Sequence, residues 1–86
     1  MEKGFKLSVV TGDETVFEGQ VSSVNLPTGF GSVGILRGHA PMLCAVSRGT
    51  LRALQDGESL RILVGDGVAS VAEGELTVLV SDGKLE

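Results

Sequence analysis

The sequence predicts an all-β protein, a flattened sandwich or barrel of about ten short, mostly antiparallel strands. Several short segments alternate apolar and polar residues with period two, the pattern of a strand that buries one face. Thirteen glycines are spread along the chain, where they are typical of turns between short elements. No window longer than about ten residues keeps helical spacing without Gly or Pro, so no helix is expected.

The first third of the chain predicts three strands. Phe5, Leu7 and Val9 alternate with polar neighbours until TGDET breaks the run, which indicates a strand and then a turn. A short VFEG segment leads into VSSVNLP, in which Val24 and Leu26 share one buried face. That segment ends at a proline, which cannot donate a hydrogen bond to a central ladder.

From Thr50 onward, turn signals separate TLRALQ, SLRILV, VASVA and LTVLVS, which we predict to be four strands in a meander. DGE and EGE between them place Gly where a tight hairpin requires positive φ, so antiparallel pairing is expected. Leu60, Ile62 and Val64 are expected to share one face of their strand, opposite Arg61 and Leu63. Leu76, Val78 and Val80 are expected to share one face of theirs, opposite Thr77 and Leu79.

Length and composition restrict the function. The 86 residues, 1–86, are expected to form a single domain, because a chain this short has room for one core. A net charge of −4 has the wrong sign for a nucleic-acid partner or a bare anionic membrane surface. No apolar run reaches the roughly 18 residues of a membrane span, so no direct membrane insertion is expected. Three Phe without Tyr or Trp leave little to stack on a base or a sugar.

The segment GFGSVG at 29–34 spells the dinucleotide-binding pattern G-x-G-x-x-G. That motif works because its last glycine opens a helix whose N-terminus holds a pyrophosphate. Here Gly38 and Pro41 would break such a helix within two turns, so we expect a surface loop and no cofactor.

His39 is the one candidate general base near neutral pH, and it would need a serine or Cys44 as nucleophile. No nucleophile-elbow motif accompanies it, and a hydrogen-bonded loop anchor is the competing interpretation. The lone Cys44 is expected to be a buried or interface-facing small hydrophobe. Glu73, Glu75 and Asp82 are the nearest approach to an acidic cluster, and no metal site is expected.

The segment GILRGHAPML is the most unusual in the chain, since it combines glycines, the histidine and a proline with aliphatic residues. One interpretation is a docking loop that exposes Ile35, Leu36, Met42 and Leu43 to a partner. Another makes these residues a crossover into the core. A small β-sandwich hydrolase that uses His39, or a ligand-binding module with a deep apolar pocket, are the alternatives from other functional classes.

These residues closely resemble the G-I-x-P-G-H-A-P-L-L signature of the epsilon-subunit family of F-type ATP synthases. KLSVVTGDETVFEGQVSSVNLP resembles the first strands of that family, and LVGDGVASVAEGELTVLVSD resembles its last ones. The match covers essentially residues 5–82. It implies a ten-stranded β-sandwich, in agreement with the fold predicted from the turn spacing.

The resemblance implies a non-catalytic rotor subunit of the central stalk, which couples ion flow to ATP synthesis or hydrolysis. Its partners would be the gamma subunit, the membrane c-ring and other F1 subunits, on the cytoplasmic face of a bacterial inner membrane. The implied c-ring contacts are Gly29, Phe30, Gly31 and Ser32. The implied gamma contacts are Thr11, His39, Ala40, Pro41, Met42 and Cys44.

The chain departs from the family pattern at several places. Ser32 stands where many relatives have an acidic residue, so Phe30 is expected to supply an apolar contact instead. Arg37 replaces the usual proline and adds a cation, and Asp66 replaces a common glycine, which questions whether that position needs positive φ. The helical hairpin that follows the sandwich in family members is not predicted within these residues.

Overall fold

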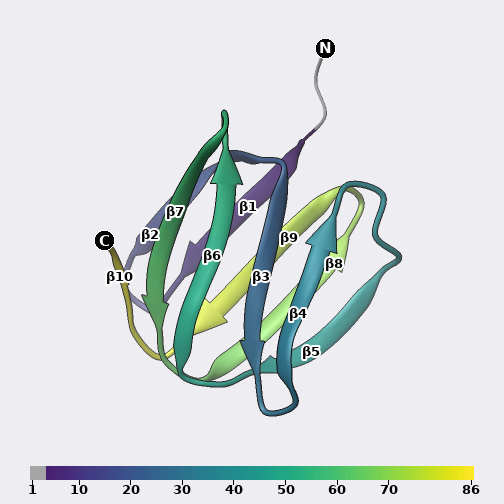
Figure 1. Cartoon of the computed structure of the whole chain (residues 1–86). Coiled ribbons are helices and arrows are strands. Elements are labelled where there is room, and N and C mark those ends of the chain that lie inside the picture. Colours follow the sequence, from purple (N-terminus) through teal and green to yellow (C-terminus); the bar gives the residue numbers. More distant parts are fainter. Residues whose placement is uncertain (1–3) are drawn as a thin grey trace.

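The computed structural model of the protein describes residues 4–86, which form ten strands and no helix (Figure 1). The all-β prediction is therefore confirmed, and with it the strand number and the mostly antiparallel pairing. None of the described residues belongs to a helix that could cross a membrane. The strands are β1 (Phe5–Val10), β2 (Thr15–Val21), β3 (Ser23–Thr28), β4 (Gly31–Leu36), β5 (Met42–Val46), β6 (Gly49–Gln55), β7 (Glu58–Val64), β8 (Gly67–Ala72), β9 (Glu75–Val80) and β10 (Gly83–Leu85).

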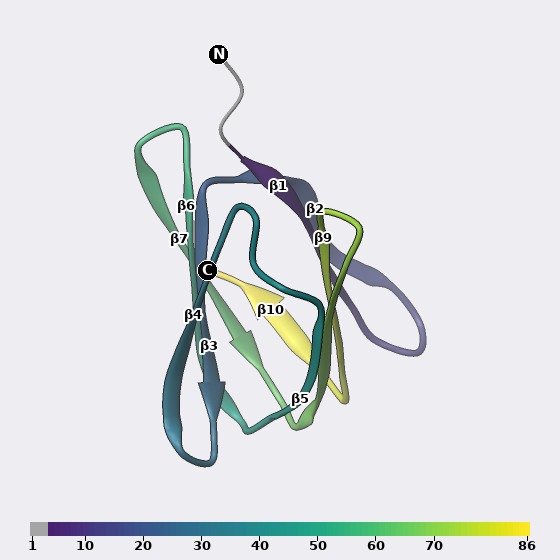
Figure 2. The same ribbon diagram turned by 90° about the vertical axis from the view of Figure 1, so that its right-hand side faces the viewer.

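The strands form two five-stranded sheets that pack face to face (Figure 2). Sheet A has the order β2-β1-β9-β8-β5, and sheet B has the order β10-β7-β6-β3-β4. The pair β1–β9 is parallel, and the other paired strands of the described chain are antiparallel. Along one side the edge strands β2 and β10 lie against each other. Along the other side, β4 of sheet B continues into β5 of sheet A through residues 37–41, visible in Figure 2.

The inner faces of both sheets are aliphatic. Alternation along β1 buries every second residue, and β9 shows the same pattern, as the sequence predicts. Among residues 4–86 no polar or charged side chain is buried, so packing of apolar side chains stabilises the sandwich. The buried residues are Phe5, Leu7, Val9, Val21, Val24, Leu26, Ile35, Val46, Leu51, Ala53, Ile62, Val64, Ala69, Val71, Leu76, Val78 and Val80. Leu60, predicted to share a face with Ile62 and Val64, packs against the core but is only partly buried.

Two hairpin turns lie where the DGE and EGE segments predict them. Asp56 and Gly57 have φ values of 51° and 81°, and Glu73 and Gly74 have 53° and 79°. Positive φ at both central residues defines the type I′ turn, whose twist suits a two-residue hairpin. The predicted antiparallel pairs β6–β7 and β8–β9 are therefore confirmed, one in each sheet.

The predicted four-stranded meander is wrong, because β7 lies in sheet B and β8 in sheet A. The connection between them bonds to the β9–β10 connection instead of closing a hairpin. Gly65 N donates to Asp82 O at 2.9 Å, and Ser81 N donates to Asp66 O at 2.9 Å. Gly67 is required by close approach, since a Cβ there would collide with the carbonyl group of Leu79. Unlike the hairpin glycines, these glycines do not have positive φ.

Asp66, which replaces a common glycine of the family, also has an ordinary φ. Its side-chain Oδ1 accepts a hydrogen bond from Arg48 N at 2.8 Å. The carboxylate thus ties the β7–β8 connection of the chain to the β5–β6 connection. An aspartate at this position joins two crossovers between the sheets, and it needs no left-handed backbone.

Candidate functional site: two docking regions

The β3–β4 hairpin carries the four residues that the resemblance assigns to the c-ring. Phe30 at its tip is fully exposed. Thr28 fixes the turn, because its hydroxyl donates to Gly31 O at 2.5 Å and accepts from Phe30 N at 3.1 Å. Gly31 has a φ of 106°, which favours glycine there. We call residues 29–32 the hairpin tip, a rigid turn that presents one aromatic ring.

The same hairpin contains the G-x-G-x-x-G pattern and shows whether it has the structure of a dinucleotide-binding motif. Gly29 lies in the turn, Gly31 opens β4, and Gly34 lies inside that strand. No helix follows, so the segment has no helix N-terminus to hold a pyrophosphate. The pattern match is therefore a hairpin, and the expected loop at 29–34 is largely a strand.

The connection at 37–41 is held by bonds within the loop. His39 N donates to Leu36 O at 3.0 Å, and His39 Nδ1 lies 2.7 Å from Ala40 O. Gly38 adopts a φ of 82°. The ring is exposed and, within residues 4–86, it bonds to no serine, cysteine or carboxylate. These contacts favour the loop-anchor interpretation of His39 over a general base, which needs a nucleophile in reach.

The aliphatic residues of this segment do not all point outward. Ile35 is in the core, and Met42 is half-buried against it. Cys44 is also half-buried beside the core, as predicted for a small hydrophobe. Leu36 and Leu43 are exposed. The segment is therefore a crossover into the core at Ile35, while Leu36 and Leu43 leave exposed apolar surface that a partner could cover.

Leu43 leads to a surface that sequence reasoning missed. On the outer face of sheet A, Ala45 lies opposite Val68, Val68 opposite Leu79, and Leu79 opposite Val10. We call these four residues the apolar row. Val68 and Leu79 keep 45% and 47% of their surface exposed in central strands. The alternation of β8 and β9 gave a usable signal, because residues between the core positions must face out.

The apolar row connects predicted contacts that are distant in sequence. It begins at Ala45 of β5, the strand whose Met42 and Cys44 face the core side of the sheet, and it ends at Val10, directly before Thr11. The Thr11 hydroxyl accepts from the backbone N atoms of Asp13 and Glu14, both at 3.2 Å, and so holds the β1–β2 turn. A partner that touched both edges of sheet A would cover the apolar row between them.

The cavity beside His39 has a volume of about 90 Å³ and is lined in part by Phe5, Ile35, Val71 and Leu76. Small-molecule sites usually measure about 300–1,000 Å³. This cavity is therefore too small to be the deep apolar pocket of the ligand-binding hypothesis, and the larger hollow beside β10 is lined by Arg48, Asp82 and Lys84. Within residues 4–86, no group of three or more His, Cys, Asp or Glu side chains could hold a metal ion.

One ion pair lies on the outer face of sheet A. Lys6 Nζ is 2.9 Å from Glu18 Oε2, on the neighbouring strand. The hydrogen bond to Glu18 raises the pKa of Lys6, with smaller contributions from the charges of Glu18 and Glu75. Both side chains of the pair are largely exposed, so the pair contributes little to stability.

A stiff two-sheet sandwich with an exposed aromatic tip, an apolar outer face and a small cavity has the features of a protein-docking domain. The chain belongs to the delta/epsilon-chain family of ATP synthases: the family model for the β-sandwich domain of the ATP synthase delta/epsilon chain matches residues 4–85. The resemblance stated from the sequence is therefore confirmed.

Similar proteins include the ATP synthase epsilon chain of Synechococcus sp. (strain JA-2-3B'a(2-13)), 45% identical over 73 residues. That alignment covers 85% of this chain and 53% of the relative. The chloroplastic epsilon chain of Guillardia theta is 37% identical over 75 residues, covering 87% of this chain and 57% of the relative. The chain thus spans about half the length of the curated relatives it matches.

Solved structures share the fold. A chain in the Euglena gracilis mitochondrial ATP synthase (OSCP/F1/c-ring, rotational state 1) superposes with a TM-score of 0.89 at 19% identity. The superposition covers 99% of this chain and 55% of that one. A chain in the central stalk and c-ring of the Tetrahymena thermophila mitochondrial ATP synthase has a TM-score of 0.76 at 16% identity, covering 91% and 63%.

Proposed function

We propose that this chain is the β-sandwich part of an epsilon-type subunit in the central stalk of an F-type ATP synthase. It docks on the gamma subunit and on the c-ring and makes or breaks no covalent bond. Through these contacts it helps couple ion flow, of protons or sodium, to ATP synthesis or hydrolysis. The observation that carries the proposal is one stiff sandwich with two contact regions of different character, the apolar row and the hairpin tip.

The gamma subunit is proposed to cover sheet A from Thr11 to β5. Val68 and Leu79 support this assignment because a partner would remove their exposed apolar surface from water. Leu43, 76% exposed, extends the surface toward the loop at 37–41. The proposed contacts taken from the sequence are Thr11, His39, Ala40, Pro41, Met42 and Cys44.

The c-ring is proposed to receive the hairpin tip. Ser32 carries no charge, so Phe30 is the main contact, and its ring would enter an apolar depression of the partner. The rigid turn favours this role because little conformational entropy is lost on binding. Other F1 subunits complete the assembly around the stalk.

This function places the chain on the periphery of a membrane as part of F1. The relatives include bacterial and chloroplast epsilon chains. For a bacterial source we propose the cytoplasmic face of the inner membrane. In a chloroplast-type assembly the corresponding location would differ, while the contacts with gamma and the c-ring would be the same.

The gamma contact is tested with Met42→Glu and Ala40→Glu. A buried charge at either interface position should weaken binding of purified gamma about tenfold or more, as measured by calorimetry. Ser59→Glu, on the exposed outer face of sheet B, is the matched control and should bind normally. Normal binding by both interface variants would show that the assigned face is wrong.

The c-ring contact is tested with Phe30→Ala in a pull-down with purified c-ring. Loss of one apolar anchor should weaken the interaction about tenfold, with little change when salt is raised. Leu36→Ala removes another exposed apolar side chain from β4, outside the tip, and should have no effect. A strongly salt-dependent interaction that tolerates Phe30→Ala would contradict an apolar contact.

A further inference from the structure

The outer face of sheet B takes part in neither proposed contact, and its central strands carry an unusual pair. Arg52 of β6 lies directly opposite Arg61 of β7. Like charges at opposed positions of neighbouring strands destabilise a sheet. The chain as a whole has a net charge of −4, so two adjacent arginines give this surface a charge opposite in sign to that of the whole chain. Arg61 has a carboxylate partner within the described residues and Arg52 has none, so Arg52 is the member of the pair whose charge the fold leaves unbalanced.

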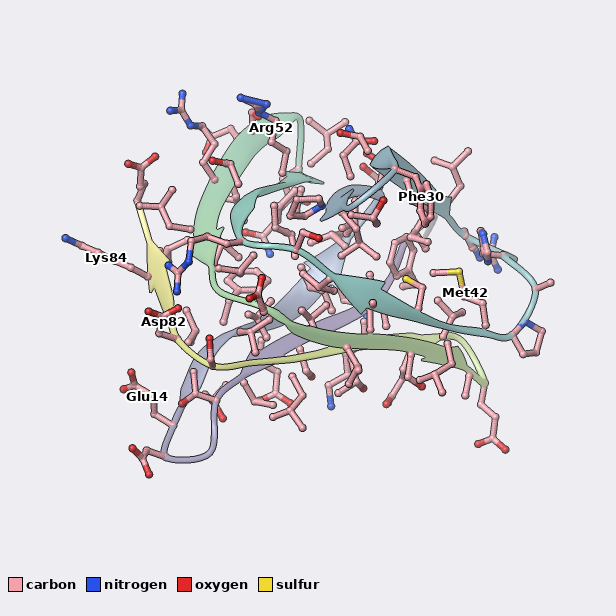
Figure 3. All side chains as sticks on the ribbon, turned by 90° about the horizontal axis from the view of Figure 1, so that it is seen from below. Glu14, Phe30, Met42, Arg52, Asp82 and Lys84 are labelled. Atoms are coloured by element: carbon pink, nitrogen blue, oxygen red, sulfur yellow. The ribbon has the colours of Figure 1, made fainter. Side chains whose placement is uncertain are left out.

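Further cations extend this surface. Lys84 pairs with Leu63 in the β10–β7 register, and Arg48 precedes β6. We call Arg48, Arg52, Arg61 and Lys84 the basic face. Figure 3 shows Arg52 pointing away from the outer face of sheet B and Lys84 pointing outward from the edge strand β10.

Two of the four cations are paired within the chain. Arg48 lies 3.6 Å from Asp82, and Arg61 Nε lies 3.3 Å from Glu86 Oε1. In the described part of the chain, Arg52 and Lys84 take part in no ion pair. Glu86 N also donates to Arg61 O at 2.9 Å, so this carboxylate belongs to the neighbouring chain segment within sheet B. The basic face therefore keeps an excess of positive charge.

The basic face is hollowed at one end, beside Arg48 and Lys84, and it is partly apolar. A hollow of about 380 Å³ lies between β6, β7 and β10, lined by residues that include Arg48, Lys84, Asp82 and Leu63. Leu63, on one side of the arginine pair, is 40% exposed, and Leu54, on the other side, is 39% exposed. The two leucines are about 14 Å apart by strand geometry, a distance that a helix covers in about nine residues.

We propose that the basic face binds a carboxylate-rich amphipathic helix of a partner protein. Around the arginine pair the backbone is already bonded on both sides, because Asn25 of β3 pairs with Arg52 and Glu86 N donates to Arg61 O. A partner at this place is therefore recognised by its side chains. A helix lying on a sheet places apolar residues over Leu54 and Leu63 and carboxylates over Arg52 and Arg61. A small phosphate ligand fits less well, because the face has no helix N-terminus and no glycine-rich cradle.

The proposal is tested by calorimetry with the full chain and a synthetic helical peptide of about 18 residues that carries Leu on one face and Glu beside it. A second peptide has Gln in place of Glu. The variant Arg52→Gln/Arg61→Gln is compared with Lys6→Gln/Arg37→Gln, which removes the same charge from other surfaces. Inorganic tripolyphosphate serves as a small polyanion.

The expected result is binding of the Glu peptide to the wild-type chain and to the control variant. Binding should be about tenfold weaker for Arg52→Gln/Arg61→Gln, for the Gln peptide and at high salt. The thermal midpoint of Arg52→Gln/Arg61→Gln should equal or exceed that of the wild type, because like-charge repulsion is relieved. Equal peptide binding by both double variants would overturn the proposal. So would tripolyphosphate binding at the arginine pair without peptide binding, which would indicate a small-anion site.

Discussion

The outer faces of the two sheets differ far more than their inner faces do. Inside, both sheets offer the same kind of residue, represented by Leu7 in sheet A and Ile62 in sheet B, each fully buried. Outside, sheet A carries the apolar row, whereas sheet B carries the arginine pair of β6 and β7. The alternation of buried residues along the strands thus specifies a sandwich that many proteins could share. The outward-facing residues of the same strands give the two faces the different surfaces that we propose for different partners.

The largest expected effect tests whether the inner faces are equivalent. Leu7→Ala and Ile62→Ala should each lower the free energy of unfolding by about 2–5 kcal/mol, because each leaves a cavity in a closely packed core. Urea denaturation with linear extrapolation measures both. A cost below about 1 kcal/mol for one variant alone would mean that the core depends mainly on the other sheet.

The next effect separates the outer faces. Val68→Glu should weaken gamma binding about a hundredfold while the fold persists, because the charge would lie at the centre of the proposed interface. Arg52→Glu reverses a charge on a central strand of sheet B and should leave gamma binding unchanged. Circular dichroism of both variants checks the fold. Equal loss of binding in the two variants would remove the distinction between the faces.

The hairpins at one end of each sheet should respond alike. Gly57→Ala and Gly74→Ala should each destabilise the chain by about 1 kcal/mol, because a side chain is strained at positive φ. Gly12, which has ordinary φ and open space around its Cβ position, provides the control, and Gly12→Ala should cost nothing. Thermal denaturation distinguishes these outcomes, and a neutral Gly74→Ala would contradict the type I′ assignment.

The smallest effect concerns the Lys6–Glu18 pair of sheet A. The raised pKa of Lys6 means that its contribution to stability is present below the ordinary lysine pKa and disappears as the pH rises through the raised value. As the pH is raised through the alkaline range, the free energy of unfolding should therefore fall slightly less for Lys6→Gln than for the wild type. The pair is exposed, so a large difference between the two curves would contradict its surface character.

The sequence predicted the parts of the fold that depend on local chemistry. The alternation of β1 and β9 and the hairpin glycines Gly57 and Gly74 each correspond to a physical requirement of one short segment. The meander prediction was wrong because the GDG connection has the composition of a hairpin turn. Whether the chain turns back or crosses to the other sheet depends there on bonds to distant residues, such as Gly65 N to Asp82 O. Sheet assignment is a tertiary property that glycine spacing does not encode.

The candidate site was predicted in part for the same reason. The hairpin tip and the loop at 37–41 are contiguous in sequence, so a motif can identify them. The apolar row draws its residues from β1, β5, β8 and β9, and only strand pairing places Val10, Ala45, Val68 and Leu79 side by side. A side chain such as Val68 looks like any other strand residue until its neighbours are known.

Methyl NMR of the chain with purified gamma subunit tests the central claim most directly. Each face carries exposed methyl groups: Leu43, Val68 and Leu79 on sheet A, and Leu54 and Leu63 on sheet B. We expect gamma to shift or broaden the methyl signals of sheet A and to leave those of sheet B unchanged. Perturbation confined to the sheet B set, or the absence of any perturbation at saturating gamma, would contradict it.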